Sequence, residues 1–351
     1  MITGGAIVME NKLPKGLSVN AESIYPDGRP SAKYRMEAKD QGIIIKHGGG
    51  PKDCDTYGMR QAMINKENDV YHLFYDATSK AGVWCVCLTT SGDLVRWEKK
   101  GPLMELGLPG DMDSKYAGSP WVYKEGSEWH MFYIGSHNVN KDDGVPSFPY
   151  LTLKARSISL SGPWMKQKDV IPFRTKSGTY YSESASAGHI VKHNGENLQF
   201  FSGSPKQKEG ECVLRTLGIA RTKDLNTAWT PDNEPIVPAE EQIENSSLYF
   251  EPACKKWFLF TNHIGLEKDT PEYTDAIWVY WSSDLNKWYP KNKAVVLDGK
   301  NCKWSKRCIG LPTVLPIGNR LAIFYDAPGG NSISHLNRDA GLAWLDLPLL
   351  S

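Results

Sequence analysis

The chain has 351 residues, with 41 Lys and Arg against 40 Asp and Glu, so its net charge is +1. This balance gives no electrostatic reason to expect nucleic acid or an anionic membrane as a partner. Hydrophobic residues at 40% and charged residues at 23% are typical of a globular protein and exclude a disordered chain. The 12 Trp and 16 Tyr, together with 32 Gly and 22 Pro, favour a β-rich fold with many turns.

The sequence has no apolar stretch near the ~18 residues that a membrane span needs. Its start, Met1 to Lys15, lacks a basic segment followed by a long apolar core, so no signal peptide is expected. A cytoplasmic location is therefore favoured, with a periplasmic or secreted one left open. The seven Cys form no CxxC pair, which argues against a zinc site. Free thiols are favoured, and a Cys302–Cys308 disulfide closing a small loop is the alternative.

Five aromatic-rich apolar runs recur along the chain at intervals of roughly 60 residues. Each is preceded by a shorter apolar run and a polar turn, which is the pattern of a β-hairpin. A further strand then leads to a turn ending in Trp, as in Thr90–Trp97 (TSGDLVRW) and Ser282–Trp288 (SSDLNKW). The five runs are Tyr71–Thr78, Trp129–Ser136, Leu198–Ser204, Trp257–His263 and Leu321–Ala327.

Each period therefore holds about four short strands, and no segment has the apolar spacing of a long helix. Four strands repeated five times predict an all-β fold, a single five-bladed β-propeller spanning residues 1–351 with four antiparallel strands per blade. Residues 1–40 are expected to form an extended N-terminal arm. The following segment, Gly42–Lys46 (GIIIK), is predicted to close the ring by pairing with the last blade, between Leu311 and Leu345. A pair of β-sandwiches is the alternative, and the even spacing of the five copies argues against it.

In a propeller, the first strand of each blade lines the central axis, so polar residues at the start of these strands converge on one pocket. The five segments that enter these strands are the place to look for chemistry. They are Cys54–Met63, Asp113–Val122, Tyr181–Val191, Ile243–Tyr249 and Cys308–Val314.

Several of these segments resemble those of known enzymes. Tyr71–Tyr75 after its polar turn, and Tyr116–Val122 (YAGSPWV), are similar to the first two blades of fructosidases. Glu244–Tyr249 (ENSSLY) is similar to the fourth-blade strand of arabinofuranosidases and xylosidases. Over its full length the chain resembles the five-bladed propeller glycoside hydrolases, namely glycoside hydrolase family 43 and the related fructosidases, anhydrogalactosidases and mannoside phosphorylases.

The resemblance implies three carboxylates around the axis: a base, a general acid and one that orients and tunes pKa. Cleavage of a glycosidic bond independently requires one protonated and one ionised carboxyl group. Glu244 opens a predicted inner strand at the position that the resemblance assigns to the acid, and its alternative is a solvated loop residue. The base is expected near Arg60 or Gln61, and neither is a carboxylate. Asp55 is therefore the candidate base, with an Asx turn as its structural alternative.

Glu183 and Asp113, which precede the third and second blades, are the candidates for the remaining carboxylate. Arg60 is placed to hold a sugar hydroxyl or a carboxylate, and Gln61 to hold water. Trp121 and Tyr273 are candidate stacking platforms for sugar rings, although most Trp in such a fold pack between blades. Further candidate substrate contacts, each with a structural alternative, are His189, His263, Asp275, His335, Arg338 and Asp339.

The sequence thus predicts a glycoside hydrolase that removes a terminal furanose or pentose from an oligo- or polysaccharide by carboxylate acid/base catalysis. Inversion of configuration is implied by the resemblance alone. Two alternatives stay open. One is a phosphorylase, in which phosphate replaces the activated water and basic residues bind it. The other is a non-catalytic carbohydrate-binding propeller. No cofactor is expected, although some relatives carry a central metal ion, which the three His residues could support.

Overall fold

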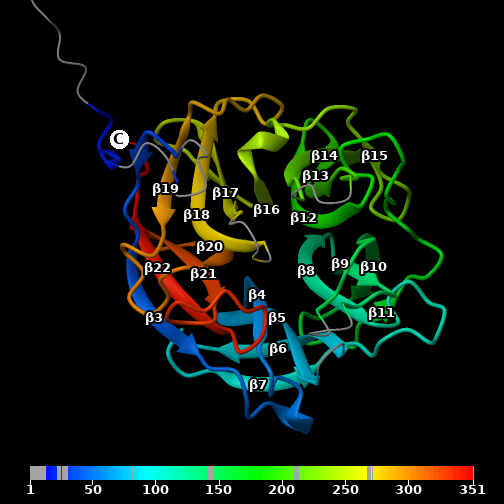
Figure 1. Ribbon diagram of the computed structural model, residues 1–351. Coiled ribbons are helices and arrows are strands. Elements are labelled where there is room, and N and C mark those ends of the chain that lie inside the picture. Colours follow the sequence, from blue (N-terminus) through cyan, green and yellow to red (C-terminus); the bar gives the residue numbers. More distant parts are fainter. Residues whose placement is uncertain are drawn as a thin grey trace, which may run out of the picture.

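The computed structural model describes residues 13–21, 25, 31–80, 83–140, 145–208, 213–266, 270 and 272–350. Its strands form five antiparallel units of four strands, called blades 1 to 5 here, around a common centre (Figure 1). The sandwich alternative is therefore wrong. Blade 1 contains β4 (Met59–Glu67), β5 (Val70–Lys80), β6 (Val83–Ser91) and β7 (Glu98–Pro102). Blade 2 contains β8 (Tyr116–Glu125), β9 (Glu128–Ser136), β10 (Leu151–Ser157) and β11 (Met165–Lys166).

Blades 3 to 5 repeat this order. Blade 3 contains β12 (Ser184–His193), β13 (Glu196–Ser204), β14 (Thr216–Thr222) and β15 (Thr230–Pro231). Blade 4 contains β16 (Ile243–Glu251), β17 (Lys256–Gly265), β18 (Tyr273–Ser282) and β19 (Lys293–Leu297). Blade 5 contains β20 (Gly310–Ile317), β21 (Arg320–Ala327), β22 (Asp339–Asp346) and β3 (Lys39–Ile45). Two short 3-10 helices, η1 (Pro51–Asp53) and η2 (Ala239–Glu241), lie in loops. The five predicted aromatic runs lie on the second strands, β5, β9, β13, β17 and β21.

The N-terminal segment supplies the outermost strand of blade 5, as predicted. In β3, Gly42 pairs with Leu342 and Ile45 with Ala340 of β22. Asp40, on the same strand, accepts hydrogen bonds from the Tyr325 hydroxyl (2.6 Å) and from the backbone N–H of Lys303 (2.7 Å). Residues from the first and last parts of the sequence therefore share one sheet.

The rest of the expected arm, residues 1–40, lies partly outside the described residues. Within it, β1 (Ser18–Val19) pairs with β2 (Tyr34–Arg35), and β2 runs parallel to β19 on the outer edge of blade 4. The core is divided into apolar layers between neighbouring blades. One such layer packs Met59 and Leu73 of blade 1 against Phe324 and Leu342 of blade 5.

All five inner strands carry a β-bulge at the same place. The register shifts after Arg60, Gly118, Ser186, Glu244 and Gly310. A bulge re-aims side chains, and this one turns the start of each inner strand toward the axis. In four blades the next residue has a positive φ, and a side chain of the preceding blade accepts its N–H. These four pairs are Gln61 with Asp326, Ser119 with Asp76, Asn245 with Ser202, and Leu311 with Asn262.

The part of the chain that the structure describes contains no helix long and apolar enough to cross a membrane. Its six cysteines are free thiols, and Cys212 lies outside the described residues. Cys302 contacts the Tyr325 hydroxyl, and Cys308 accepts a hydrogen bond of 2.9 Å from Arg338.

Candidate functional site

A cavity of about 140 Å³ lies where the five bulges converge. Its walls come from the inner strands and from loops that join the second strand of a blade to the third. The polar side chains that line it are Arg60, Gln61, Tyr116, Ser119, Tyr150, Ser186, Ser202, Arg215, Glu244, Asn245, Glu272, Thr274, His335 and Arg338. Glu244 and Glu272 are the two carboxylates in this lining.

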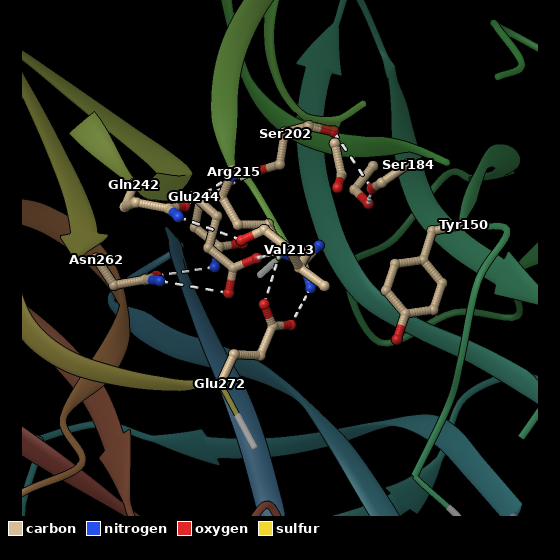
Figure 2. A network of polar contacts seen from close by, with 12 residues as sticks. Tyr150, Ser184, Ser202, Val213, Arg215, Gln242, Glu244, Asn262 and Glu272 are labelled. Carbon is tan, nitrogen blue, oxygen red and sulfur yellow. Dashed lines mark hydrogen bonds and ion pairs between the residues drawn. The ribbon is translucent and has the colours of Figure 1, made fainter. Parts of the chain in front are cut away.

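Glu244 stands at the bulge of β16, which directs its side chain into the cavity (Figure 2). Its Oε2 lies 3.7 Å from Arg215 Nε, and its Oε1 accepts a long hydrogen bond of 3.4 Å from Asn262 Nδ2. Burial raises the pKa of Glu244, while Arg215 acts in the opposite direction and Glu272 raises it further. Glu244 is therefore a carboxyl group that holds its proton to higher pH than an exposed glutamate.

Glu272 approaches the same guanidinium from the loop between β17 and β18 (Figure 2). Its Oε2 accepts a hydrogen bond of 3.2 Å from Arg215 Nε, and its Oε1 accepts a shorter one from Nη2. This is the fork-shaped pairing of a guanidinium with a carboxylate. Arg215 is held in turn by the Phe148 ring, 4.9 Å from its guanidinium carbon, and by Gln242, which accepts its backbone N–H. One arginine thus contacts two carboxyl groups, and burial raises the pKa of one of them, Glu244.

Arg60 occupies the corresponding bulge of blade 1. Its guanidinium lies over the Trp84 ring at 4.5 Å and donates from Nη1 to His335 Nδ1 at 3.1 Å. Burial, together with Arg338 and Arg60, lowers the pKa of His335 well below its usual value, so this imidazole is neutral. Asp76 lies beneath, with its Oδ2 3.8 Å from Arg60 Nη2.

Asp76 is completely buried and accepts hydrogen bonds from the Ser119 backbone N–H and the Tyr116 hydroxyl. Burial raises its pKa to about 6. Asp326 is the equivalent residue of blade 5, where it accepts from the Gln61 backbone and from Arg338 Nη1. Both carboxylates fix the positions of cavity residues and do not themselves line the cavity.

The structure brings five of the sequence-predicted site residues together at this cavity: Arg60, Gln61, Glu244, His335 and Arg338. It places Asp55 elsewhere. Asp55 is fully buried in the loop before β4, where its Oδ2 accepts a hydrogen bond of 2.5 Å from Lys99 and its Oδ1 one of 2.9 Å from the Gly50 N–H. Asp55 therefore does not face the cavity as the predicted base would, and its contacts are those of a structural ion pair that holds the loop before β4.

The other two predicted carboxylates also lie outside the lining. Asp113 is paired with Lys166 at 2.5 Å and with the Tyr133 hydroxyl at 2.9 Å, in a separate depression on blade 2. Glu183 borders a third hollow beside Phe148, and its carbonyl accepts the N–H of Tyr150.

The predicted aromatic and histidine contacts pack between strands. Trp121 is buried and meets His189 edge to face, at 5.8 Å between ring centroids. His263 stacks on Trp278 at 3.9 Å and contacts Asp275 at 2.8 Å through Nδ1. Two further predicted contacts are Tyr273 and Asp339. The buried ring of Tyr273 packs against Gly265, and Asp339 binds the backbone and ring of His47. None of these six residues lines the cavity.

Sequence reasoning missed Glu272, Arg215, Tyr150, Asp76 and Asp326. The last two had a signal: blades 1 and 5 both read FYDA, at Phe74–Ala77 and Phe324–Ala327, and this aspartate is absent from the other three copies. Glu272, Arg215 and Tyr150 each lie immediately before the third strand of a blade, outside the aromatic runs and the inner strands. Within the described ranges, no group of three or more His, Cys, Asp or Glu is arranged to hold a metal ion.

Comparison with known proteins supports this interpretation of the fold. A family model described as the glycosyl hydrolases family 32 N-terminal domain matches residues 61–182, which span blades 1 and 2. A search of curated proteins gives no match. Among solved structures, one titled glycoside hydrolase has 13% identity and a TM-score of 0.68, and the alignment covers 90% of this chain and 96% of that one.

Two further structures are an α-L-arabinofuranosidase from Podospora anserina in complex with cellotriose and an α-L-arabinanase from Cellvibrio cellulosa. The first has 12% identity and a TM-score of 0.59, covering 89% of this chain and 97% of that one. The second has 13% identity and a TM-score of 0.59, covering 83% and 92%. The resemblance to the five-bladed propeller glycoside hydrolases is thus confirmed in fold, and blades 1 and 2 match a glycoside hydrolase family domain.

Proposed function

We propose that this chain, which has the fold of the five-bladed propeller glycoside hydrolases, hydrolyses the glycosidic bond of a terminal sugar bound in the central cavity. The observation that carries the proposal is the pair Glu244 and Glu272 on either side of Arg215. The substrate in this proposal is the end of an oligo- or polysaccharide, because a cavity of about 140 Å³ accommodates about one sugar unit.

Glu244 is the general acid in this proposal. A general acid must carry its proton near the working pH, and burial raises the pKa of this carboxyl group. The bulge of β16 presents it to the cavity, and Thr261 fixes the strand locally by donating to the Glu244 carbonyl at 2.7 Å. Its proton passes to the oxygen of the leaving sugar as the glycosidic bond breaks.

Glu272 is the second carboxylate of the pair in this proposal, in place of Asp55. It either removes a proton from the attacking water or attacks the anomeric carbon directly. Both carboxylates lie within 4 Å of Arg215 Nε, so their nearest oxygens are less than ~7 Å apart. Inverting pairs span ~6.5–9.5 Å and retaining pairs ~5–5.5 Å, so the anomer released first distinguishes them. Inversion remains the prediction taken from the resemblance.

Hydrolysis is favoured over phosphorolysis, because two of the three cavity arginines already donate hydrogen bonds to protein groups and are less available to bind phosphate. Arg215 is engaged with Glu272, and Arg338 donates to Asp326, to Cys308 and to the Ser334 carbonyl. A phosphate dianion binds best where several cationic groups are available to it. The sequence predicts a preference for a furanose or a pentose, and the substrate panel described below therefore includes glycosides of these neutral sugars.

The test is hydrolysis of a panel of 4-nitrophenyl glycosides and natural disaccharides, with and without inorganic phosphate. We expect release of free sugar at a rate that phosphate does not change, and ¹H NMR of the first product gives its anomeric configuration. Glu240, an exposed glutamate four residues before Glu244, provides the matched control. Activity that survives Glu244→Gln as well as Glu240→Gln on a poor leaving group contradicts the proposal.

A further inference from the structure

The cavity contains one cation whose hydrogen-bonding capacity is largely unused. The Arg60 side chain is 10% exposed and lines the cavity. Its one side-chain hydrogen bond among the described residues is the donation from Nη1 to His335. Its Nε is buried without a partner. A guanidinium carries five N–H donors, and an unsatisfied buried donor is costly.

The neighbouring carboxylate does not supply the missing acceptor. Asp76 balances part of the charge of Arg60 but lies 3.8 Å away, beyond hydrogen-bond distance. Its two oxygens are occupied by the Ser119 N–H and the Tyr116 hydroxyl. His335 is neutral and accepts a single bond. The Trp84 ring holds the guanidinium plane from one face, so its orientation is fixed before any ligand binds.

The other two arginines of the cavity donate hydrogen bonds to protein acceptors from two or three of their side-chain nitrogens. Arg338 is 1% exposed and donates from Nε, Nη1 and Nη2 to protein acceptors. Arg215 forms its fork with Glu272. One guanidinium with free donors matches a ligand that carries one negative charge in a planar group. A carboxylate meets this description, because its two oxygens accept parallel hydrogen bonds from one guanidinium.

We propose that Arg60 binds the carboxylate of an acidic sugar, so that the unit held in the cavity is a uronic acid residue. This rests on the proposed function only in placing a sugar there. A phosphate dianion fits less well, because Arg60 offers it one positive charge and Asp76 stands close by. A neutral sugar would leave the buried donors of Arg60 to be satisfied by hydroxyl groups alone.

The test compares sugars that differ only at C6. Binding of D-glucuronate and D-galacturonate, and of glucose and galactose, is measured on the full chain by calorimetry, using wild type, Arg60→Gln and Arg60→Lys. We expect at least one uronate to bind roughly tenfold or more tightly than its neutral counterpart. Arg60→Gln should abolish this preference by weakening the uronate much more than the neutral sugar, and Arg60→Lys should restore only part of it.

Arg320→Gln is the matched control, since Arg320 also lies over a Trp ring (Trp344, 4.1 Å) but is exposed at the start of β21, outside the cavity lining. Thermal melts check that every variant is folded. Two results overturn the inference: equal binding of uronates and neutral sugars, or Arg60-dependent binding of inorganic phosphate with no binding of uronates. A wild-type uronate preference without hydrolysis of any glycoside contradicts the proposed function alone. Hydrolysis of neutral glycosides that Arg60→Gln leaves intact contradicts this inference alone.

Discussion

Replacing Glu272 with Gln should lower the pKa of Glu244. In the wild type, burial is the main cause that raises this pKa, and the negative charge of Glu272 adds to it, while Arg215 opposes both. Glu272→Gln keeps the shape of the side chain but removes its charge. The Arg215 guanidinium, no longer shared between two carboxylates, is then available to Glu244 alone.

The size of the effect follows from the geometry. Arg215 Nε is 3.7 Å from Glu244 Oε2. Two unit charges ~4 Å apart interact with ~4 kcal/mol at an effective dielectric constant of ~20, and one pKa unit corresponds to ~1.36 kcal/mol. Arg215 already stabilises ionised Glu244 in the wild type, so only part of this energy is gained. We therefore expect the pKa of Glu244 to fall, because the repulsion from Glu272 is lost while the attraction of Arg215 stays.

The assay is a ¹³C NMR titration of the glutamate side-chain carboxyl groups, with the Glu244 signal assigned by its absence from Glu244→Gln. A general acid works only when protonated, so activity declines as pH rises through its pKa. A lower pKa therefore moves the alkaline decline of kcat/KM to lower pH in Glu272→Gln. Glu240→Gln, an exposed change of the same kind, should leave the titration unchanged. An unchanged or higher pKa of Glu244 in Glu272→Gln would refute the shared-arginine model.

Three further substitutions test the remaining assignments. Asp55→Asn should destabilise the fold by about 3–5 kcal/mol in urea, because it removes the carboxylate that balances the charge of Lys99, yet keep kcat/KM within about threefold. A hundredfold loss of kcat would restore Asp55 as the base. Asp40→Ala leaves several hydrogen-bond donors around β3 without an acceptor and should lower the free energy of unfolding by about 3 kcal/mol or more, against about 0.5 kcal/mol for exposed Lys39→Ala. Equal losses would contradict the role of Asp40 in holding the ring-closing strand. The folded-state pKa of Asp76 is raised from 3.8 to about 6, so its contribution to stability is present below about pH 4 and is lost as pH rises to about 6. The stability difference between wild type and Asp76→Asn should therefore change by roughly 3 kcal/mol between pH 4 and 7, and a constant difference would show that Asp76 does not titrate in this range.

The fold could be predicted from the repeat, because the four strands of a propeller blade follow one another in the sequence, except in blade 5, whose outer strand is β3. The five aromatic runs became the second strands, and the turns before Trp behaved as expected. In two of these turns Asp224 and Asp284 accept the backbone N–H two residues on, and Trp288 returns to the core. The pairing of Gly42 with Leu342 was also predicted, since a ring of repeats needs its ends joined.

The site was only partly predictable, for a physical reason. Glu244 lies on an inner strand, so its place in the repeat fixed its direction. Glu272 and Arg215 lie immediately before the third strands of their blades, outside the aromatic runs and inner strands on which the prediction was based. Asp55 precedes an inner strand but sits on the far side of its turn, held by Lys99. Chain position alone does not determine which way such a residue faces.

The central claim is that Glu244 and Glu272 act as the acid and its ionised partner, and single-turnover rates on two matched substrates test it most directly. One substrate carries a nitrophenolate, a good leaving group, and the other the natural sugar alcohol. Glu244→Gln should slow the natural substrate by roughly 10²–10⁴-fold and the nitrophenyl glycoside much less, whereas Glu272→Gln should slow both by similar factors. If Glu244→Gln slows both substrates equally, or if Glu272→Gln leaves both rates unchanged, the acid/base assignment is contradicted.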